Sequence, residues 1–157
     1  MNNKEIMKST NTPGSLLFLV SKAQFHLASH IFEQMGLFRG QPPVLFQLGL
    51  HEGITQVELA EILEVTPATM TNILRRMQTS GLITRVRDTA DARISHVFLT
   101  AEGRLALDRA HQMTQQMDGI AFNGLSPDEL VALTDLLGRV HSNLRSASGV
   151  RCRVSVS

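Results

Sequence analysis

Residues 66–87 read TPATMTNILRRMQTSGLITRVR, and this stretch decides the fold. A Thr followed by a Pro is favoured at the N-cap and first turn of a helix. Apolar residues then recur every three or four positions, which predicts one buried stripe: Met70, Ile73, Leu74 and Met77. Gly81 followed by Leu82 is typical of a helix end. From Leu82 the period changes to two, as in a strand. The stretch therefore predicts a helix that leads directly into a strand.

The flanking residues extend this pattern on both sides. Residues 55–58 read TQVE, a capping box that predicts a short helix ending near Leu63. A second alternating run covers residues 94–99 and predicts a hairpin with its loop at residues 88–93. Two short helices joined by Glu64 and Val65 and followed by a hairpin form a helix-turn-helix with a wing.

The rest of the chain shows helical spacing. Helices are predicted from Ser15 to Gly36, from Pro42 to Leu50, and over two long segments near the C-terminus. In these last two segments apolar residues alternate at four and three positions, as in a coiled coil. We expect them to be buried between two copies of the chain: Ala110, Met113, Met117, Leu133, Leu137, Val140 and Leu144.

Composition excludes several classes of protein. Among 157 residues, 43% are hydrophobic and 18% charged, which excludes general disorder. A single cysteine excludes a disulfide framework and suits a cytoplasmic location. The longest uncharged stretch is residues 9–21, and its apolar centre, residues 16–20, is far shorter than the roughly 20 residues of a membrane span. We expect a soluble, cytoplasmic protein with no membrane partner.

The charges point to a nucleic-acid partner. Residues 65–87 contain four arginines and no acidic residue. The predicted second helix carries short polar groups and arginines opposite its apolar stripe. Arginine suits guanine, asparagine suits adenine, and alanine or threonine can contact a thymine methyl group. A solvated helix face is the alternative for two arginines alone, but the cap, the acid-free face and the hairpin together favour DNA. The candidate residues are Thr66, Ala68, Thr69, Thr71, Asn72, Arg75 and Arg76.

Several motifs resemble the MarR family of winged-helix regulators. They are QVELA at 56–60, TPATMT at 66–71, GLI at 81–83, DAR at 91–93 and VFLTAEG at 97–103. The resemblance covers residues 15–144. It implies a homodimer, held by its terminal helices, that binds a pseudo-palindromic operator. It also implies that Arg93 enters the minor groove. We expect Arg87 and Asp91 to belong to the DNA-binding surface as well. Asp91 is placed to orient the Arg93 guanidinium.

This gives a mainly α fold with a winged helix-turn-helix head and a helical dimerisation region. We expect one domain over residues 1–157. Residues 15–36 and 101–146 form the dimerisation helices, residues 41–100 the DNA-binding region, and residues 1–11 and 147–157 flexible ends.

The first helix suggests two further hypotheses. His26 and His30 are four residues apart and could hold Zn²⁺ if His111 or His141 supplied more ligands. More often such residues form a polar edge, so we expect no resident metal. The same helix is rich in Met and Phe and could line a pocket for a small aromatic effector, with Phe25, His26, His30 and Met35 as candidates. Cys152 lies in the tail, where a redox switch is not expected.

An enzyme and a protein-interaction module are the rival classes. The chain has no glycine-rich phosphate loop, no nucleophile elbow and no HExxH run, so we expect no catalysis and no cofactor. A winged helix used only for protein contacts would not need an acid-free face. The sequence therefore predicts a homodimeric, sequence-specific DNA-binding regulator, a repressor released by a small molecule. A metal-responsive regulator of the same fold and a winged-helix interaction module are the alternatives.

Overall fold

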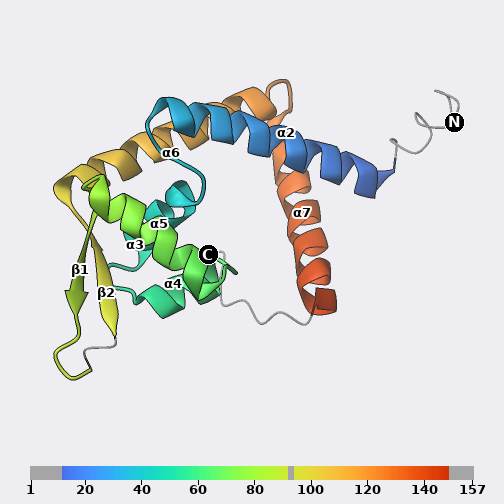
Figure 1. Cartoon of the computed structure of the whole chain (residues 1–157). Coiled ribbons are helices and arrows are strands. Elements are labelled where there is room, and N and C mark those ends of the chain that lie inside the picture. The colour runs from blue at the N-terminus through green and yellow to red at the C-terminus, as the bar shows by residue number, and fades with distance from the viewer. Residues whose placement is uncertain (1–11, 92–93, 149–157) are drawn as a thin grey trace, which may run out of the picture.

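The computed structural model describes residues 12–91 and 94–148. In these residues the chain forms six helices and one antiparallel hairpin (Figure 1). In chain order the elements are α2 (Pro13–Gln34), α3 (Gln41–Leu50), α4 (Gln56–Ile62), α5 (Pro67–Thr79), β1 (Ile83–Arg87), β2 (Ser95–Leu99), α6 (Ala101–Ala121) and α7 (Pro127–Ser148). The mainly α winged-helix fold predicted from the sequence is confirmed, and the helices begin and end within a few residues of their predicted bounds.

Local side-chain chemistry sets where the helices begin. The Thr55 hydroxyl accepts from the Glu58 amide while the Glu58 carboxylate accepts from the Thr55 amide, so the predicted capping box is present. The hydroxyl of Thr66 caps α5 in the same way by accepting from the amide of Thr69. At the other end of α5, Gly81 takes a φ of +74° and the Leu82 amide donates to the Met77 carbonyl. This is the Schellman ending that the Gly-Leu pair predicts.

The core lies between α3, α4, α5, the hairpin and the first half of α6. Met70, Leu74 and Met77 are fully buried in it, and Ile73 packs against its edge. The predicted stripe of α5 is therefore confirmed. The other large side chains that are fully buried are Val44, Leu45, Leu48, Leu59 and Val97.

The first half of α6 packs against α2, α3 and β2 of its own chain. Ala106 and Ala110 belong to the buried core, and Met117 is also buried. This differs from the expectation that Ala110 and Met117 meet a partner chain, because both side chains are already covered within one copy. The periodic spacing of α6 comes from packing within the chain at these positions, since a core-facing helix and an interchain helix share the same period.

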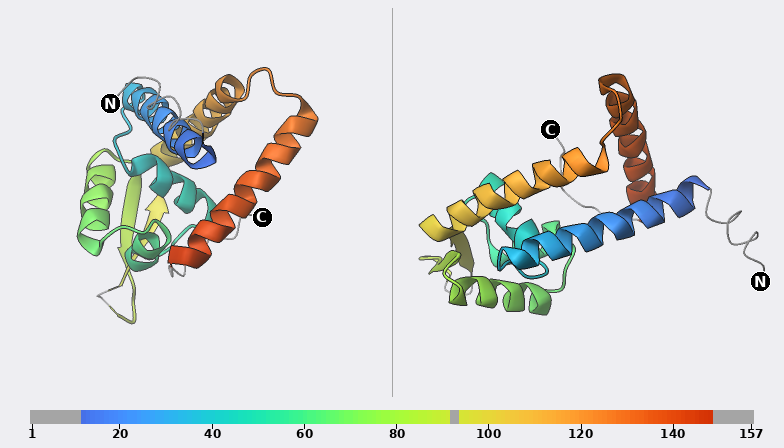
Figure 2. Two further views of the ribbon diagram at one scale, coloured as in Figure 1. Left: turned by 90° about the vertical axis from the view of Figure 1, so that its right-hand side faces the viewer. Right: turned by 90° about the horizontal axis from the view of Figure 1, so that it is seen from above.

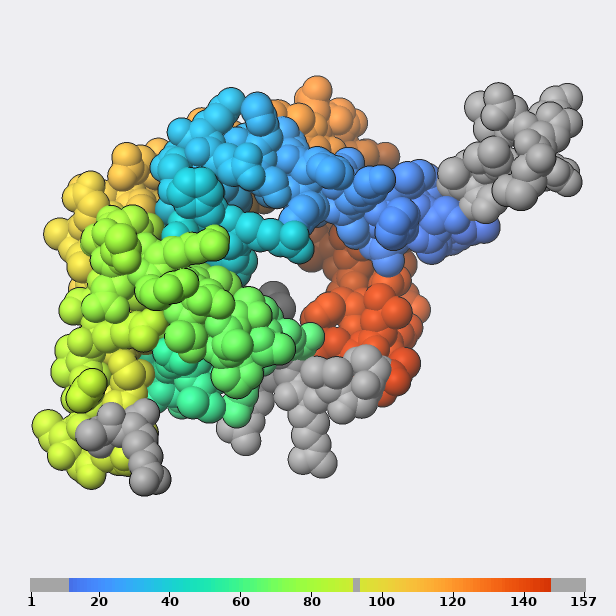
Figure 3. Space-filling view, in the orientation of Figure 1, coloured from blue at the N-terminus to red at the C-terminus, as the bar shows by residue number. Residues whose placement is uncertain are grey.

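The long helices α2 and α7 extend beyond the head (Figure 2). In the space-filling view both stand out from the head rather than lie flat against it (Figure 3). No residue of α2 is buried, and none is buried from Pro127 to residue 147 of α7. Many of their apolar side chains are exposed: Leu16, Phe18, Leu19, Val20, Phe25, Val131, Leu136, Leu137, Val140 and Leu144. No helix in the described residues is long and apolar enough to cross a membrane.

The hairpin is joined to the loop that precedes α4. Its register pairs Ile83 with Leu99 and Arg87 with Ser95. The backbone of β2 also pairs with residues 53–55: the Gly53 amide donates to the Val97 carbonyl, and the Val97 amide donates to the Ile54 carbonyl. The wing and the helix-turn-helix are therefore connected by backbone hydrogen bonds as well as by the core.

Candidate nucleic-acid interface

The turn between α4 and α5 fixes the direction of α5. Glu64 takes a φ of +52°, an uncommon conformation for a residue with a side chain, and the Val65 amide donates to the Ala60 carbonyl. Thr66 then caps α5, whose buried side packs against α4 and the hairpin. The opposite side of α5 is left facing away from the core.

Every candidate residue on this side of α5 is exposed. We call this surface the α5 face and define it by Thr66, Ala68, Thr69, Thr71, Asn72, Arg75 and Arg76. No acidic residue lies on α5. Arg87, at the end of β1, and Asp91, in the wing loop, are exposed as well. The sequence thus correctly predicts which side of α5 is accessible.

Hydrogen bonds organise the α5 face. The Arg75 guanidinium donates to Asn72 Oδ1 at 3.1 Å. Gln56 Nε2, from the first turn of α4, donates to Thr71 Oγ1 at 2.8 Å, and that hydroxyl donates to the Pro67 carbonyl at 2.8 Å. Gln56 was not predicted as a site residue, because sequence spacing does not show which side chain of α4 contacts α5.

Arg85 differs from the other three arginines of the basic segment. It stands opposite Val97 in the hairpin register and shares the inward side of β1 with Ile83. Its Nε and Nη2 atoms are buried and have no hydrogen-bond partner among the described residues. Burial lowers the pKa of Arg85, although a guanidinium stays charged at any ordinary pH. One of the four positive charges of residues 65–87 therefore lies on a half-buried side chain on the inward side of β1.

A histidine joins the wing to the loop before α4. His96 Nδ1 lies 2.8 Å from the carbonyl oxygen of Gly53, and its Nε2 lies 3.1 Å from Asp88 Oδ2. Both neighbours are acceptors, so the doubly protonated ring satisfies them best. The hydrogen bond to Gly53, followed by that to Asp88, raises the pKa of His96. Sequence reasoning placed His96 in a strand but did not assign it a role.

Asp88 also shapes the start of the wing loop. Its Oδ1 accepts hydrogen bonds from the amides of Ala90 at 2.7 Å and Asp91 at 3.0 Å. The bond from Asp91, then those from His96 and Ala90, lower the pKa of Asp88. The Ile94 amide donates to the Asp91 carbonyl on the other side of the loop. Arg93, the predicted minor-groove residue, lies outside the described residues, so its pairing with Asp91 stays a prediction.

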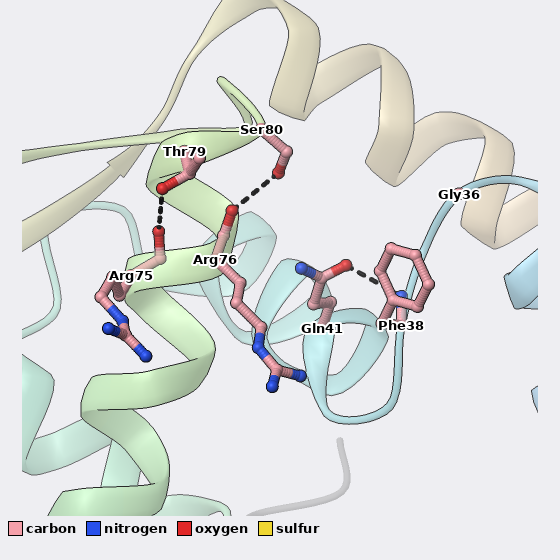
Figure 4. Close-up of a pocket in the computed structure, with 7 residues that line it drawn as sticks. All are labelled: Gly36, Phe38, Gln41, Arg75, Arg76, Thr79 and Ser80. Atoms are coloured by element: carbon pink, nitrogen blue, oxygen red, sulfur yellow. Dashed lines mark hydrogen bonds between the residues drawn. The ribbon is translucent and has the colours of Figure 1, made fainter.

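The effector-pocket residues predicted in α2 and at its C-cap make contacts within the chain. The Arg39 guanidinium lies 5.3 Å from the ring centroid of Phe25. The rings of Phe25 and His26 are T-shaped, with their centroids 6.2 Å apart. Gln34 Nε2 donates to His30 Nε2 at 3.0 Å. Met35 packs against the core. A pocket of about 550 Å³ lies between the α2–α3 connector and the end of α5 (Figure 4).

The structure gives the metal hypothesis no support. His111 packs against the Phe46 ring with centroids 5.0 Å apart. Within residues 12–91 and 94–148, no three His, Cys, Asp or Glu side chains are grouped so that they could hold a metal ion. Among these described residues, His26 and His30 have no third ligand beside them of the kind that a zinc site requires.

Comparison with known proteins connects this geometry to a family. The MarR family model matches residues 39–95, which include α3, α4, α5 and the hairpin. An uncharacterized HTH-type transcriptional regulator of Bacillus cereus is 30% identical over 138 residues, which cover 85% of this chain and 92% of that protein. The chain belongs to the MarR family. The expectation of a transcriptional regulator rather than an enzyme is confirmed.

Two solved structures resemble this MarR-family protein over most of their length. A mutant of MarR from Escherichia coli in complex with operator DNA has a TM-score of 0.72 and 25% identity, and the match covers 89% of this chain and 99% of that one. A complex of MepR from Staphylococcus aureus with DNA has a TM-score of 0.75 and 26% identity, covering 84% and 98%. Both similarities extend beyond the head into the long helices.

Proposed function

We propose that this MarR-family protein is a homodimeric repressor that binds a pseudo-palindromic site in duplex DNA and is released by a small molecule. The observation that carries the proposal is the α5 face, which is exposed, free of acidic residues and ordered by the Arg75–Asn72 hydrogen bond. The DNA complexes of the related E. coli and S. aureus proteins support the same interpretation.

The α5 face has the chemistry of a major-groove surface. Arg75 and Asn72 offer donors suited to the edges of guanine and adenine, and Thr71 and Ala68 offer methyl groups. The capped start of α5 adds backbone N–H groups that favour phosphate. Arg87, at the end of β1, is exposed in the wing. In the proposal α5 enters the major groove, and the wing, with Arg93, lies along the adjacent minor groove.

The dimer is supported by the apolar surface of α7. Leu137 is 42% exposed, Val140 39% and Leu144 60%, while Leu133 is half-buried. A helix surface with this many exposed apolar side chains is normally covered by another protein surface. A two-fold interface would cover the same surface on both copies and fix the distance between their two α5 helices. Met113, half-buried on α6, lies outside this α7 surface.

The decisive experiment selects bound duplexes from a random library with the wild-type protein. Enrichment of two half-sites about one helical turn apart would support the proposal. Affinity for the selected site should fall steeply with salt, because phosphate contacts release counterions. Failure to enrich any sequence, with no salt-dependent binding of random duplex, would favour a winged-helix module that contacts only protein. A zinc titration of the same protein tests the metal-responsive alternative.

A further inference from the structure

A side-chain hydrogen bond joins α4 to α5 at the α5 face. Gln56, in the first turn of α4, donates from Nε2 to Thr71 Oγ1 at 2.8 Å. Gln56 is half-buried, whereas Thr71 is exposed. The two helices pack against each other (Figure 1). Because the two residues are 15 positions apart in sequence, the bond depends on how the helices pack and not on how either helix is built.

A second hydrogen bond sets the direction of the first. The Thr71 hydroxyl lies 2.8 Å from the Pro67 carbonyl, one turn earlier in α5. A carbonyl oxygen can only accept, so the single hydroxyl proton goes to Pro67. A hydroxyl that has donated its proton can only accept further hydrogen bonds, and Gln56 must therefore offer its amide nitrogen. The Thr71 hydroxyl has no proton left for a base.

The contact from Gln56 favours one arrangement of the Thr71 side chain. A helical threonine divides between two χ1 rotamers, because its hydroxyl can bond the carbonyl either three or four residues earlier. In this structure the partner is the carbonyl four residues earlier, that of Pro67. Gln56 adds a second hydrogen bond to this arrangement. One net hydrogen bond favours the rotamer that makes it by about two- to twelvefold, so the Thr71 methyl group is held in one position.

The methyl group is therefore the part of Thr71 that is available to DNA. In the major groove, thymine differs from the other bases by its C5-methyl group, which apolar groups can contact. A threonine hydroxyl that is free to rotate suits donor and acceptor base edges alike, and so discriminates poorly between bases. Because the hydroxyl of Thr71 is engaged by both Gln56 and Pro67, it cannot donate to a base edge.

The other threonines of the α5 face are held differently. The hydroxyls of Thr66 and Thr69 lie 2.9 Å from each other, and either can be the donor. Among the described residues, neither hydroxyl is hydrogen-bonded to α4. Their protons are not committed to one direction, so the argument for a fixed methyl group applies to Thr71 and not to them.

Gln56 is itself held in place by its neighbours. It follows Thr55, the N-cap of α4, which forms the capping box with Glu58. The backbone of Thr55 also pairs with that of His96 in β2. The donor that holds Thr71 therefore belongs to the segment where α4 meets the wing, and its backbone is fixed on both sides.

We propose that Gln56 is a positioning residue for DNA sequence recognition: it holds Thr71 so that the threonine methyl group contacts a thymine in each half-site. The inference rests on the proposed function, since it assigns one part of DNA recognition to a contact between α4 and α5. Gln56 itself touches no base in this proposal. Its role is to decide which group of Thr71 meets the DNA.

The first test needs no DNA. Three-bond scalar couplings of Thr71, measured by NMR in the full chain, report its χ1 populations. We expect one rotamer in the wild type and a mixture of two in Gln56→Met, which keeps the side-chain length and the helix propensity but removes the donor. Gln112→Met, at an exposed glutamine of α6, is the matched control and should leave Thr71 unchanged. Mixed rotamers in the wild type, or no change in Gln56→Met, would overturn the proposal.

The second test replaces thymine with deoxyuridine, which lacks only the C5-methyl group, one position at a time in the selected duplex. At one position in each half-site the wild type should lose about fourfold in affinity, as expected for one buried methyl group. Gln56→Met should lose less there, and so should Thr71→Ser, which has no methyl group. In the Thr71→Val background Gln56→Met should have no further effect, because no hydroxyl remains for Gln56 to hold.

The outcomes separate this inference from the proposed function. If the random library yields no DNA site, the proposed function fails and the inference falls with it, even where the Thr71 rotamer is fixed. If a site is selected but deoxyuridine is tolerated at every thymine, the positioning role is wrong and the proposed function stands. The same holds if Gln56→Met weakens all sequences evenly and leaves the deoxyuridine effect unchanged. Circular dichroism melts establish that each variant is folded before its binding is compared.

Discussion

His96 Nε2 lies 3.1 Å from Asp88 Oδ2, so a side chain of β2 contacts the first residue after β1. On its other side, the same ring contacts the carbonyl of Gly53 in the loop before α4. His96 therefore joins three segments of the head. The carboxylate of Glu58, at the start of α4, adds a favourable electrostatic contribution to the protonated ring.

The stability of the head should depend on pH through this contact. The pKa of His96 is raised above 6.5, so its stabilising contribution is complete below pH 6.5 and is lost as pH rises through the raised value. The pKa of Asp88 is lowered below 3.8, so its contribution is present above pH 3.8 and is lost as pH falls through the lowered value. We expect the difference in melting temperature between wild type and His96→Gln to shrink from about pH 5 to about pH 9.

Asp88→Asn provides the control for this titration. The carboxylate is the second cause of the raised histidine pKa, after Gly53. In the Asp88→Asn background the pH-dependent effect of His96→Gln should be smaller, and the imidazole should titrate at lower pH by NMR. An unchanged imidazole titration would show that the two side chains do not interact in solution.

Arg75→Ala should change the sequence preference of DNA binding. The Arg75 guanidinium lies on the α5 face and is hydrogen-bonded to Asn72. Loss of one bidentate contact to a base costs about 1–3 kcal/mol of binding free energy. We expect weaker binding and relaxed preference at one position in each half-site, measured against an operator library. Arg93→Ala should instead weaken binding to all DNA sequences evenly and make the affinity less dependent on salt. Arg109→Ala is the control and should bind DNA as the wild type does. If Arg75→Ala weakened all sequences evenly and Arg93→Ala changed the preference at single positions, the proposed roles of α5 and the wing would be exchanged.

Gly103 and Gly119 form a matched pair of glycines on α6. A Cβ atom at Gly103 would overlap the Leu82 carbonyl oxygen, whereas nothing lies within 4 Å of one at Gly119. Gly103→Ala should lower the free energy of unfolding by about 1–3 kcal/mol or more, because the backbone at Leu82 must shift to make room for the added methyl group. Gly119→Ala should raise it by about 0.5–1 kcal/mol through helix propensity. Urea denaturation measures both, and equal effects would contradict the close approach at Gly103.

Leu137→Asp combined with Val140→Asp should disrupt the dimer. Two carboxylates buried without partners in an interface would cost several kcal/mol. Light scattering should give twice the mass of one chain for wild type and the mass of one chain, or insoluble protein, for the double variant. Ser142→Asp, placed elsewhere around α7, should remain dimeric. A folded, monomeric wild type at micromolar concentration would exclude the proposed assembly.

The sequence predicts most of the head because its signals are local. The capping box at Thr55, the cap at Thr66 and the glycine ending at Gly81 all rest on residues within five positions of one another. The exposed side of α5 follows from the same period that places Met70 and Met77 inside. Such features depend on spacing along one helix, and spacing is visible in the sequence.

The contacts between segments could not be predicted in this way. The period of α6 shows that Ala110 is buried but not whether α2 and α3 or a second chain covers it. Alternation in β1 places Arg85 with Ile83 but does not say which side faces the core. The pocket joins residues 36–41 to the end of α5, far apart in sequence. Helical spacing places Phe25, His26 and His30 on one helix but does not show which side chains of other elements lie beside them.

The attachment of α6 to the end of α5 has a mechanical consequence. Thr100 Oγ1 donates to the Gly81 carbonyl at 2.6 Å, and the Thr100 amide donates to that of Leu82 at 3.1 Å. α6 then runs for 21 residues, about 31 Å at 1.5 Å per residue. If α5 and α6 turn together about Thr100, a tilt of about 10° moves the far end of α6 by about 5 Å over that length. The same tilt moves the end of a helix of 13 residues, the length of α5, by only about 3 Å, so the displacement is larger at the base of α7 than at the DNA-facing helix.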